Sequence, residues 1–318
     1  MTDFMTEDNA RDRLGIEADV ALGTSANAGE VVADGGAGDT VCVVAGEGAG
    51  VVAGDGANAS VVGTGGANDA PAAGESARSR ARAAFDAWAR ARKEATVRAS
   101  DRLAWVADDA RENRHARGLY RHVLWLLAGA YREWLCRERR EGRADAEGLP
   151  ERRFRVLDLG CGSGALTALV RDALPYARVT GIDLSGGMVD AARERLGGTV
   201  RLYRADAERL PFAEGSFDAV LANDVFHHLP DGPRASFESW RVLARDGVLV
   251  LGDTWAPAPA RGVLNQLVLP HSAGGDVCVR SEAELTGMVG AWFQEVSWKR
   301  VGLGACLLVA RKSPVDRR

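Results

Sequence analysis

Residues 156–164 read Val-Leu-Asp-Leu-Gly-Cys-Gly-Ser-Gly, and they decide the fold. An apolar strand carries the acidic residue Asp158 near its end, and three glycines then alternate with small residues. Glycine has no Cβ, so the backbone can turn sharply and a ligand can approach the main chain closely. The helix expected from about Ala165 to Leu174 points its free N–H groups at the same place. This stretch therefore predicts a nucleotide-like ligand at the carboxyl end of a parallel strand.

From Phe154 onward, short apolar runs alternate with helical stretches. Such alternation predicts an α/β fold, a doubly wound and mostly parallel seven-stranded Rossmann-like sheet with an antiparallel last strand. Ligands of such sheets lie outside the carboxyl ends of the strands, which is where the glycine run falls. Strands are expected at 155–159, 179–182, 200–205, 217–221, 247–253, 296–301 and 305–311, and helices at 165–174, 187–196, 235–243 and 281–292.

The chain divides into three segments of different composition. Residues 1–75 form a Gly/Ala/Val-rich tail with an imperfect octapeptide repeat. It has too few large apolar side chains to offset the entropy of ordering, so we expect it to be disordered. A short stacked β-repeat and a partner-binding tail are the alternatives. Residues 76–150 have helical periodicity and predict an N-terminal lid or cap. Residues 151–318 carry the α/β domain, with a proline-containing lid insertion at about 255–280.

The charge and hydropathy patterns argue against a nucleic-acid partner and against a membrane span. The formal net charge is −4, with acidic residues dominating 1–75 and arginines interleaved with acids in 76–318. A nucleic-acid-binding protein concentrates Lys and Arg on one face, so we expect no nucleic-acid partner. The sequence has no run of eighteen apolar residues, so we expect no membrane span. The acidic N-terminus also lacks the basic start and apolar core of a signal peptide.

The cysteines are odd in number, widely spaced and without a Cys-x-x-Cys pair. This pattern predicts neither a disulfide framework nor a cysteine zinc site, and we expect no metal. Free thiols are typical of a reducing cytosol, so we expect a cytoplasmic protein. The five residues are Cys42, Cys136, Cys161, Cys278 and Cys306.

Carboxylates follow the second and third predicted strands. Asp183 lies nineteen residues after Gly164, where a carboxylate can accept hydrogen bonds from both hydroxyls of an unphosphorylated ribose. Its alternative role is to help cap the helix that begins near Gly187. Asp206 and Ala207 follow the third strand, where a carboxylate and a backbone N–H can meet an adenine ring. The glycine run alone also fits the dinucleotide fingerprint, so a nicotinamide cofactor stays open at this point.

Two further motifs follow in order. Residues 216–220 read Ser-Phe-Asp-Ala-Val and lead into residues 223–229, Asn-Asp-Val-Phe-His-His-Leu. Residues 243–250 then deliver the next strand. Taken together, the five motifs resemble the class I S-adenosylmethionine-dependent methyltransferases over about residues 154–311. The resemblance is to their small-molecule branch, methyltransferase type 11 or UbiE-like.

The resemblance implies S-adenosyl-L-methionine as the cofactor and assigns its contacts. Asp158 would orient the amino-acid end, Asp183 the ribose, and Asn223 would lie near the methionine portion. The other cofactor-binding residues implied are Gly160, Cys161, Gly162, Gly164, Leu184, Met188, Asp206 and Ala207. The helix containing Phe85-Asp86 also resembles the opening helix of the family, although the usual Tyr-Asp continuation is missing.

Methyl transfer needs an acceptor held in line with the sulfonium methyl group, so that it can attack in an SN2 step away from water. A general base removes a proton from many acceptors. The candidates for that base are His228, His227 and Asp224, which follow the fourth strand, and His271 in the insertion. A structural or pocket-lining role is the alternative for the histidine pair.

We therefore expect methyl transfer to a partly apolar small molecule, at oxygen or nitrogen, with carbon acceptors also open. The Gly/Ala/Arg-rich composition is typical of high-GC bacteria, and by analogy the acceptor would be a natural product. A homodimer is compatible with this interpretation. The alternatives are an NAD-dependent oxidoreductase on the same core, and a non-methylating cofactor-binding relative whose repeat tail mediates binding.

Overall fold

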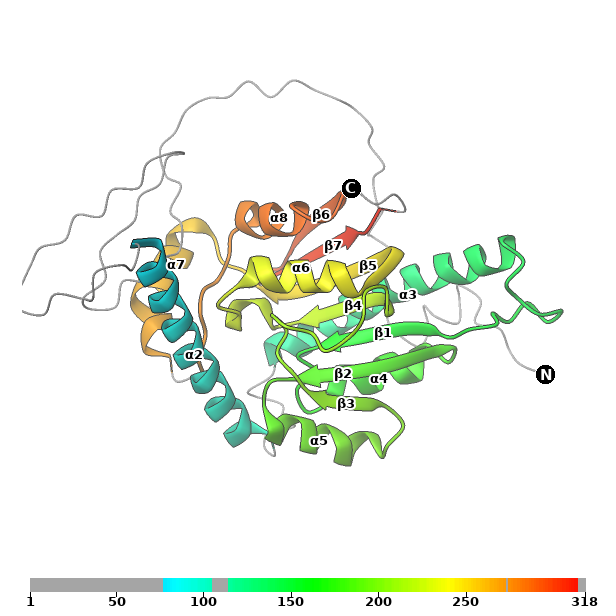
Figure 1. Ribbon diagram of the computed structural model, residues 1–318, viewed down its shortest axis with the longest axis horizontal. Coiled ribbons are helices and arrows are strands. Elements are labelled where there is room, and N and C mark those ends of the chain that lie inside the picture. The colour runs from blue at the N-terminus through cyan, green and yellow to red at the C-terminus, as the bar shows by residue number, and fades with distance from the viewer. Residues whose placement is uncertain (1–76, 105–113, 273, 314–318) are drawn as a thin grey trace, which may run out of the picture. The chain divides into compact units, whose positions relative to one another are not determined.

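The computed structural model describes residues 77–104, 114–272 and 274–313 (Figure 1). The predicted tail at 1–75 lies outside these residues, so the expectations about it are untested. Within the described part, no helix is both long enough and apolar enough to cross a membrane.

A seven-stranded sheet forms the centre of the α/β domain, as predicted. Its order is β3-β2-β1-β4-β5-β7-β6. Only β7 runs against its neighbours: it pairs antiparallel with β5 on one side and with β6 on the other, and the remaining pairs are parallel. The strands are β1 (Phe154–Leu159), β2 (Ala177–Asp183), β3 (Arg201–Arg204), β4 (Phe217–Asn223), β5 (Leu243–Thr254), β6 (Glu295–Val301) and β7 (Ala305–Arg311).

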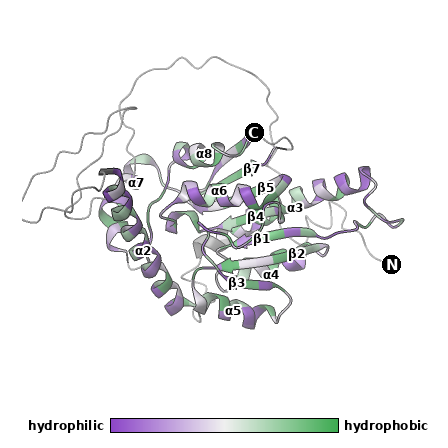
Figure 2. Ribbon diagram, in the orientation of Figure 1, coloured by the Kyte–Doolittle hydropathy of each residue, from purple (hydrophilic) through white to green (hydrophobic). Residues whose placement is uncertain are grey.

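The central strands are buried along almost their whole length because helices cover both faces of the sheet. Every residue of β4 is buried, and all but one of β1. This is the pattern expected of parallel strands with no solvent-facing side. The strands are mostly green in Figure 2, whereas the helices around them carry purple on their outer sides.

Helices α3 (Arg114–Arg140) and α4 (Ala165–Ala173) pack on one face of the sheet, with α5 (Gly186–Leu196) beside α4. Helices α6 (Gly232–Val242) and α8 (Glu282–Gly290) cover the other face. Several of these helices begin at side-chain caps that the sequence encodes: Ser185 caps α5, and Ser281 forms a capping box with Glu284 at α8. Such caps satisfy N–H groups that have no partner within the helix.

Helix α2 (Ala77–Leu103) lies across the carboxyl edge of the parallel strands (Figure 1). Near its end, Asp101 accepts hydrogen bonds from Ser185 and from the backbone N–H of Gly187, which fixes α2 on the first turn of α5. Near its middle, Thr96 donates to the carbonyl of Gly275. Helix α2 is therefore attached to α5 at one point and to Gly275 at another.

The segment at 255–280, expected as an insertion, is partly helical. It contains α7 (Ala258–Val263), the π-helical turn η2 (Leu264–Val268) and the 3₁₀ turn η3 (Leu269–His271). Near its end the segment returns to the core, where the N–H groups of Val277 and Cys278 donate to the carbonyl of His227. The segment thereby connects α2 to the loop that follows β4.

Candidate functional site

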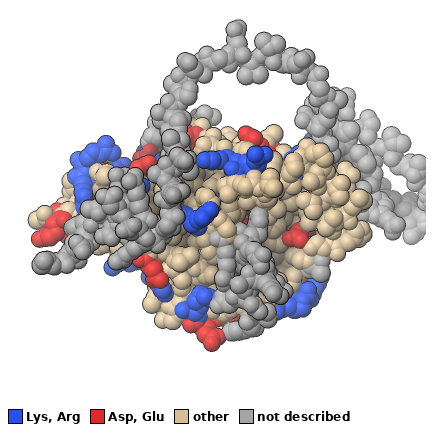
Figure 3. Space-filling view, turned by 180° about the vertical axis from the view of Figure 1, so that it is seen from behind, with Lys and Arg blue, Asp and Glu red and all other residues tan. Residues whose placement is uncertain are grey.

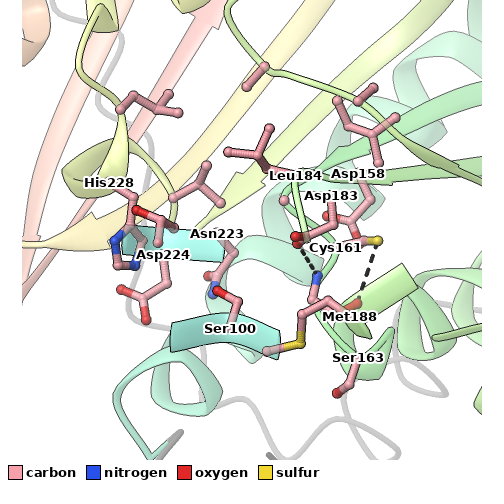
Figure 4. Close-up of a pocket in the computed structure, with 18 of the residues that line it drawn as sticks. Ser100, Asp158, Cys161, Ser163, Asp183, Leu184, Met188, Asn223, Asp224 and His228 are labelled. Carbon is pink, nitrogen blue, oxygen red and sulfur yellow. Dashed lines mark hydrogen bonds between the residues drawn. The ribbon is translucent and has the colours of Figure 1, made fainter. Parts of the chain in front are cut away.

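A cavity of about 320 Å³ opens at the carboxyl ends of β1, β2 and β4, beneath α2. The motifs predicted to bind one ligand meet there (Figure 4). Asp158 and Asp183 lie at one end of the view, Asn223 in the middle, and Asp224 with His228 at the other end. Of the predicted cofactor residues, those lining the cavity are Asp158, Gly160, Cys161, Gly162, Asp183, Leu184, Met188, Asp206, Ala207 and Asn223.

The glycine loop is shaped as a close approach to a ligand requires. Gly160 has a φ of 74°, and a Cβ there would lie 2.4 Å from Cγ2 of Val225. Gly162 has a φ of 53° and no atom within 4 Å of a Cβ position, so its backbone faces open space in the cavity wall. Gly164 does not line the cavity: a Cβ there would meet Leu196 and Ala192, so this glycine lets α4 pack against α5.

Asp183 is held by the backbone on both sides. Its Oδ2 accepts from the N–H of Gly162 at 2.9 Å, and its Oδ1 accepts from the N–H of Ser185 at 2.8 Å. Ser185 rather than Asp183 caps α5, because its Oγ accepts from the N–H of Met188 at 3.0 Å. Burial raises the pKa of Asp183 above its ordinary value despite these hydrogen bonds. The carboxylate is thus fixed in orientation at the cavity wall.

Asp158 is almost fully buried beneath the glycine loop. Its Oδ2 accepts from the hydroxyl of Thr167 at 2.6 Å. Burial, with a smaller contribution from the charge of Asp183, raises the pKa of Asp158 to about 6. A carboxyl group held in this way gains most from a cation placed beside it.

Asp206, which the resemblance assigns to the adenine, forms an ion pair with a residue that sequence reasoning missed. The Nζ of Lys93, on α2, lies 2.7 Å from Oδ2 of Asp206 and also donates to Oε2 of Glu208. Burial alone would lower the pKa of Lys93, but the two carboxylates raise it above its ordinary value. Lys93 lies on an arginine-rich helix and in no motif, so no local signal marks it. Two further α2 residues, Thr96 and Ser100, also line the cavity.

The three candidate bases after β4 have different surroundings. Asp224 and His228 line the cavity, whereas His227 does not. Asp224 has a φ of 60°, which is uncommon for a residue other than glycine, and its N–H donates to the carbonyl of Gly252 at 2.7 Å. His271 does not line the cavity either.

His227 is held by Asp253 at the end of β5. Its Nδ1 lies 2.6 Å from Oδ1 of Asp253, and its backbone N–H donates to Oδ2 at 3.1 Å. Burial alone would lower the pKa of His227. The charge of Asp253 and its hydrogen bond outweigh burial and raise the pKa to about 9. Burial and the charge of His227 lower the pKa of His228 below its ordinary value.

On the face of the molecule in Figure 3, the surface not covered by grey atoms is mostly uncharged and carries separate small groups of basic and acidic side chains. On that face, no broad basic surface of the kind used for nucleic acid is visible.

Comparison with known proteins supports the methyltransferase resemblance of the motifs. Residues 157–251 match the family described as "Methyltransferase domain". The chain is 46% identical over 96 residues to a malonyl-[acyl-carrier protein] O-methyltransferase of Geobacter sulfurreducens, covering 30% of this chain and 36% of that protein. It is 34% identical over 155 residues to a demethylmenaquinone methyltransferase of Deinococcus radiodurans, covering 47% and 61% respectively. The chain therefore spans less than two thirds of the length of either relative.

Among solved structures, the fold is similar to the complex between the Haloferax volcanii Trm112 methyltransferase activator and a putative methyltransferase. The TM-score is 0.52 at 20% identity, covering 67% of this chain and 97% of that one. At this identity the similarity concerns the fold alone. The family match and the order of the motifs lead to one conclusion: residues 157–251 of this chain belong to the methyltransferase family, and their similarity is to the class I S-adenosylmethionine-dependent enzymes of the type 11 branch.

Proposed function

We propose that this protein transfers the methyl group of S-adenosyl-L-methionine to a small-molecule acceptor. The observation that carries the proposal is the single cavity into which the glycine loop, Asp158, Asp183 and Asp206 all face. These carboxylates can accept hydrogen bonds from an ammonium group, from ribose hydroxyls and from the amino group of a base. S-adenosylmethionine has these three parts in that order.

Residues of this chain would hold the cofactor as follows. Asp158 would accept from its ammonium group, which offsets the cost of keeping a buried carboxylate ionised. Asp183 would accept from the ribose hydroxyls, and its unscreened negative charge disfavours a 2′-phosphate. Asp206 would accept from the adenine amino group once Lys93 gives way. When bound, the cofactor supplies an electrophilic methyl group on a sulfonium.

The chain's contribution to the chemistry would be position and exclusion of water. Correct placement of two reactants can supply roughly 7–11 kcal/mol of the barrier. Helix α2 covers the cavity and keeps solvent from the reacting atoms. Apolar side chains near the acceptor end favour a partly apolar acceptor, and those lining that end are Val225, Leu229 and Pro230.

Of the candidate bases, we retain the two that line the cavity. Asp224 and His228 can face an acceptor, whereas the ring of His227 faces Asp253 and Asp276. By their names, the two relatives act on a carrier-bound malonyl group and on a quinone precursor. These acceptors have no common scaffold, so the relatives support the reaction class and leave the acceptor open between oxygen, nitrogen and carbon.

Isothermal titration of the full chain separates this function from the NAD-dependent alternative. We expect S-adenosylhomocysteine to bind with one-to-one stoichiometry and NAD to give no heat above dilution. Tight binding of NAD, with no binding of S-adenosylhomocysteine, would contradict the proposal. The sequence contains no Tyr-x-x-x-Lys pair of the kind that assists hydride transfer, which also favours the methyl donor.

A further inference from the structure

A cluster of imidazoles and carboxylates lies beside the end of the cavity that Asp224 and His228 line. The Oδ1 of Asp276, from the 255–280 segment, is 3.2 Å from Nδ1 of His228 and 3.7 Å from Nε2 of His227. The three ligating atoms all lie within 4.8 Å of one another. The cavity and cofactor roles assigned above use neither His227 nor Asp276.

We propose that His227 Nε2, His228 Nδ1 and Asp276 Oδ1 bind one divalent first-row transition metal ion, with Zn²⁺ as the best representative. Two imidazoles and one carboxylate suit Zn²⁺, Mn²⁺, Fe²⁺ and Co²⁺, whereas Mg²⁺ and Ca²⁺ prefer oxygen ligands alone. This ligand set is unrelated to the cysteines, whose spacing led us to expect no metal.

The spacing of the three atoms matches a coordination shell. Zn–N and Zn–O bonds of about 2.0–2.1 Å hold neighbouring tetrahedral ligands about 3.3 Å apart. The two separations from Asp276 Oδ1, 3.2 and 3.7 Å, bracket that value. The third separation, between the two imidazole nitrogens, is at most 4.8 Å. Binding would therefore need side-chain rotations and the release of a proton from Nε2 of His227.

Groups around the cluster already orient two of the ligands. Asp253 accepts from Nδ1 of His227, which turns Nε2 toward Asp276. Ser272 donates to Oδ2 of Asp276 at 2.6 Å, which leaves Oδ1 for the ion. A carboxylate behind a histidine ligand is the usual support in protein metal sites. A second grouping, Asp224 with His227 and Asp253, would need the Nδ1 atom that already bonds Asp253, so it fits less well.

His228 supplies an independent observation. Its Nδ1 is buried, and among the described residues no atom forms a hydrogen bond with it. The 3.2 Å approach of Asp276 does not have hydrogen-bond direction, although the distance is short. A buried polar atom without a partner calls for an explanation, and a coordinated ion supplies one.

The charge balance of the cluster also favours a cation. Asp253 and Asp276 both face His227, and Oδ1 of Asp224 lies 3.7 Å from its Nδ1. The nearby guanidinium of Arg280 is directed to the carbonyls of Phe226 and Leu229. Three carboxylates therefore surround the imidazoles, and a divalent ion offsets their mutual repulsion.

A metal here would join the 255–280 segment to the loop after β4. It would fix the wall that His228 presents to the acceptor, and it would leave Asp224 as the proton-accepting group. The inference does not depend on methyl transfer, because metal binding is measured on the protein alone.

The test uses the full chain, freed of metal with EDTA and titrated with Zn²⁺ by calorimetry and with Co²⁺ by visible absorption. We expect one ion per chain, a Co²⁺ spectrum without thiolate charge-transfer bands, and a melting temperature that rises with Zn²⁺. Asp276→Asn and His228→Gln should each weaken Zn²⁺ binding at least 100-fold. Asp253→Asn, which removes only the support, should weaken it about 10- to 100-fold.

His271→Ala is the matched control, since it removes a histidine from the same segment but outside the cluster, and its Zn²⁺ binding should equal that of the wild type. Circular dichroism and S-adenosylhomocysteine binding check that each variant is folded, and the latter tests the proposed function separately. Absence of saturable Zn²⁺ and Co²⁺ binding would overturn the inference. Binding that Asp276→Asn and His228→Gln leave unchanged would also overturn it, because the ion would then lie elsewhere, such as at the cysteines.

Discussion

The ammonium group of Lys93, on α2, lies 2.7 Å from Oδ2 of Asp206, the carboxylate we assign to the adenine amino group. Under the proposed assignment, Lys93 occupies the position that the adenine amino group would take. Entry of the cofactor would then break or rearrange this ion pair, so the strength of the pair would enter the binding free energy.

Lys93→Met should strengthen binding of S-adenosylhomocysteine. A partly exposed ion pair contributes about 0.2–1 kcal/mol, so its loss should raise affinity about 1.5- to 5-fold, mainly through faster association. Calorimetry and stopped-flow fluorescence measure the two quantities. Lys93→Arg keeps the charge and should stay near the wild type. A weaker complex for Lys93→Met would mean that Lys93 contacts the cofactor itself.

Asp183→Asn should weaken the complex much more. A hydrogen bond to a charged group contributes about 1.5–3 kcal/mol, so we expect affinity for S-adenosylhomocysteine to fall about 10- to 100-fold. Asp190→Asn, on the exposed surface of α5, is the control and should have no effect. If Asp183→Asn weakened the binding of adenine alone as much as that of S-adenosylhomocysteine, the assignment of Asp183 to the ribose would be wrong.

Cofactor affinity should depend on pH through Asp158. The pKa of Asp158 is about 6 in the free protein because the group is buried, and an ammonium group beside it would lower that pKa in the complex. Binding then releases a proton below pH 6, so affinity should rise from pH 5 to about pH 6 and level off above it. Titrations of wild type and Asp158→Asn between pH 5 and 8 test this, and the variant should show a flatter profile. A wild-type affinity that falls across this range would contradict the assignment.

The stability of the fold in acid should depend on a carboxylate at the amino end of β4, at the opposite end of the strand from the cavity. Asp218 is nearly buried and accepts hydrogen bonds from Arg152 and Arg155. Burial raises its pKa, but the two arginines outweigh burial and hold it below the ordinary value. A carboxyl whose folded pKa is depressed stabilises the fold above its unfolded pKa, and that stability is lost as pH falls through the folded pKa.

Asp218→Asn should therefore lower the free energy of unfolding at pH 7 by about 1.5–3 kcal/mol, since it removes the charge that accepts hydrogen bonds from the partly exposed guanidinium groups of Arg152 and Arg155. The difference from the wild type should shrink as the pH falls below the ordinary pKa of an aspartate and through the lower pKa that Asp218 has in the folded protein. Urea denaturation at several pH values measures it. Asp172→Asn, which removes an exposed pair with Arg171, should change stability by under about 1 kcal/mol. An equal loss of unfolding free energy in both variants would show that the arginine contacts of Asp218 stabilise the fold no more than an exposed ion pair does.

The strands and the glycine loop could be predicted because their signals are local. An apolar run fixes β1, and positive φ values at Gly160 and Gly162 demand glycine in any such turn. The ends were less certain. Helix α6 begins at Gly232 rather than Ala235 because Asp231 caps it and Pro233 suits its first turn.

The rest of the site depends on contacts between residues far apart in the chain. Lys93 meets Asp206 only because α2 lies over the sheet edge, and nothing near Lys93 in sequence indicates it. Likewise, Asp276 approaches His228 only because the 255–280 segment folds back onto the loop after β4. The pair His227-His228 looked equivalent in sequence, yet one ring faces Asp253 and the other the cavity.

A crystal structure of the full chain with S-adenosylhomocysteine tests the central claim most directly. We expect the ribose hydroxyls within hydrogen-bond distance of Asp183, the ammonium group beside Asp158, and the adenine amino group on Asp206 with Lys93 displaced. The sulfur should point toward the end of the cavity formed by Asp224 and His228. A ligand bound outside this cavity, or one whose sulfur points away from those two residues, would contradict the proposed methyl transfer.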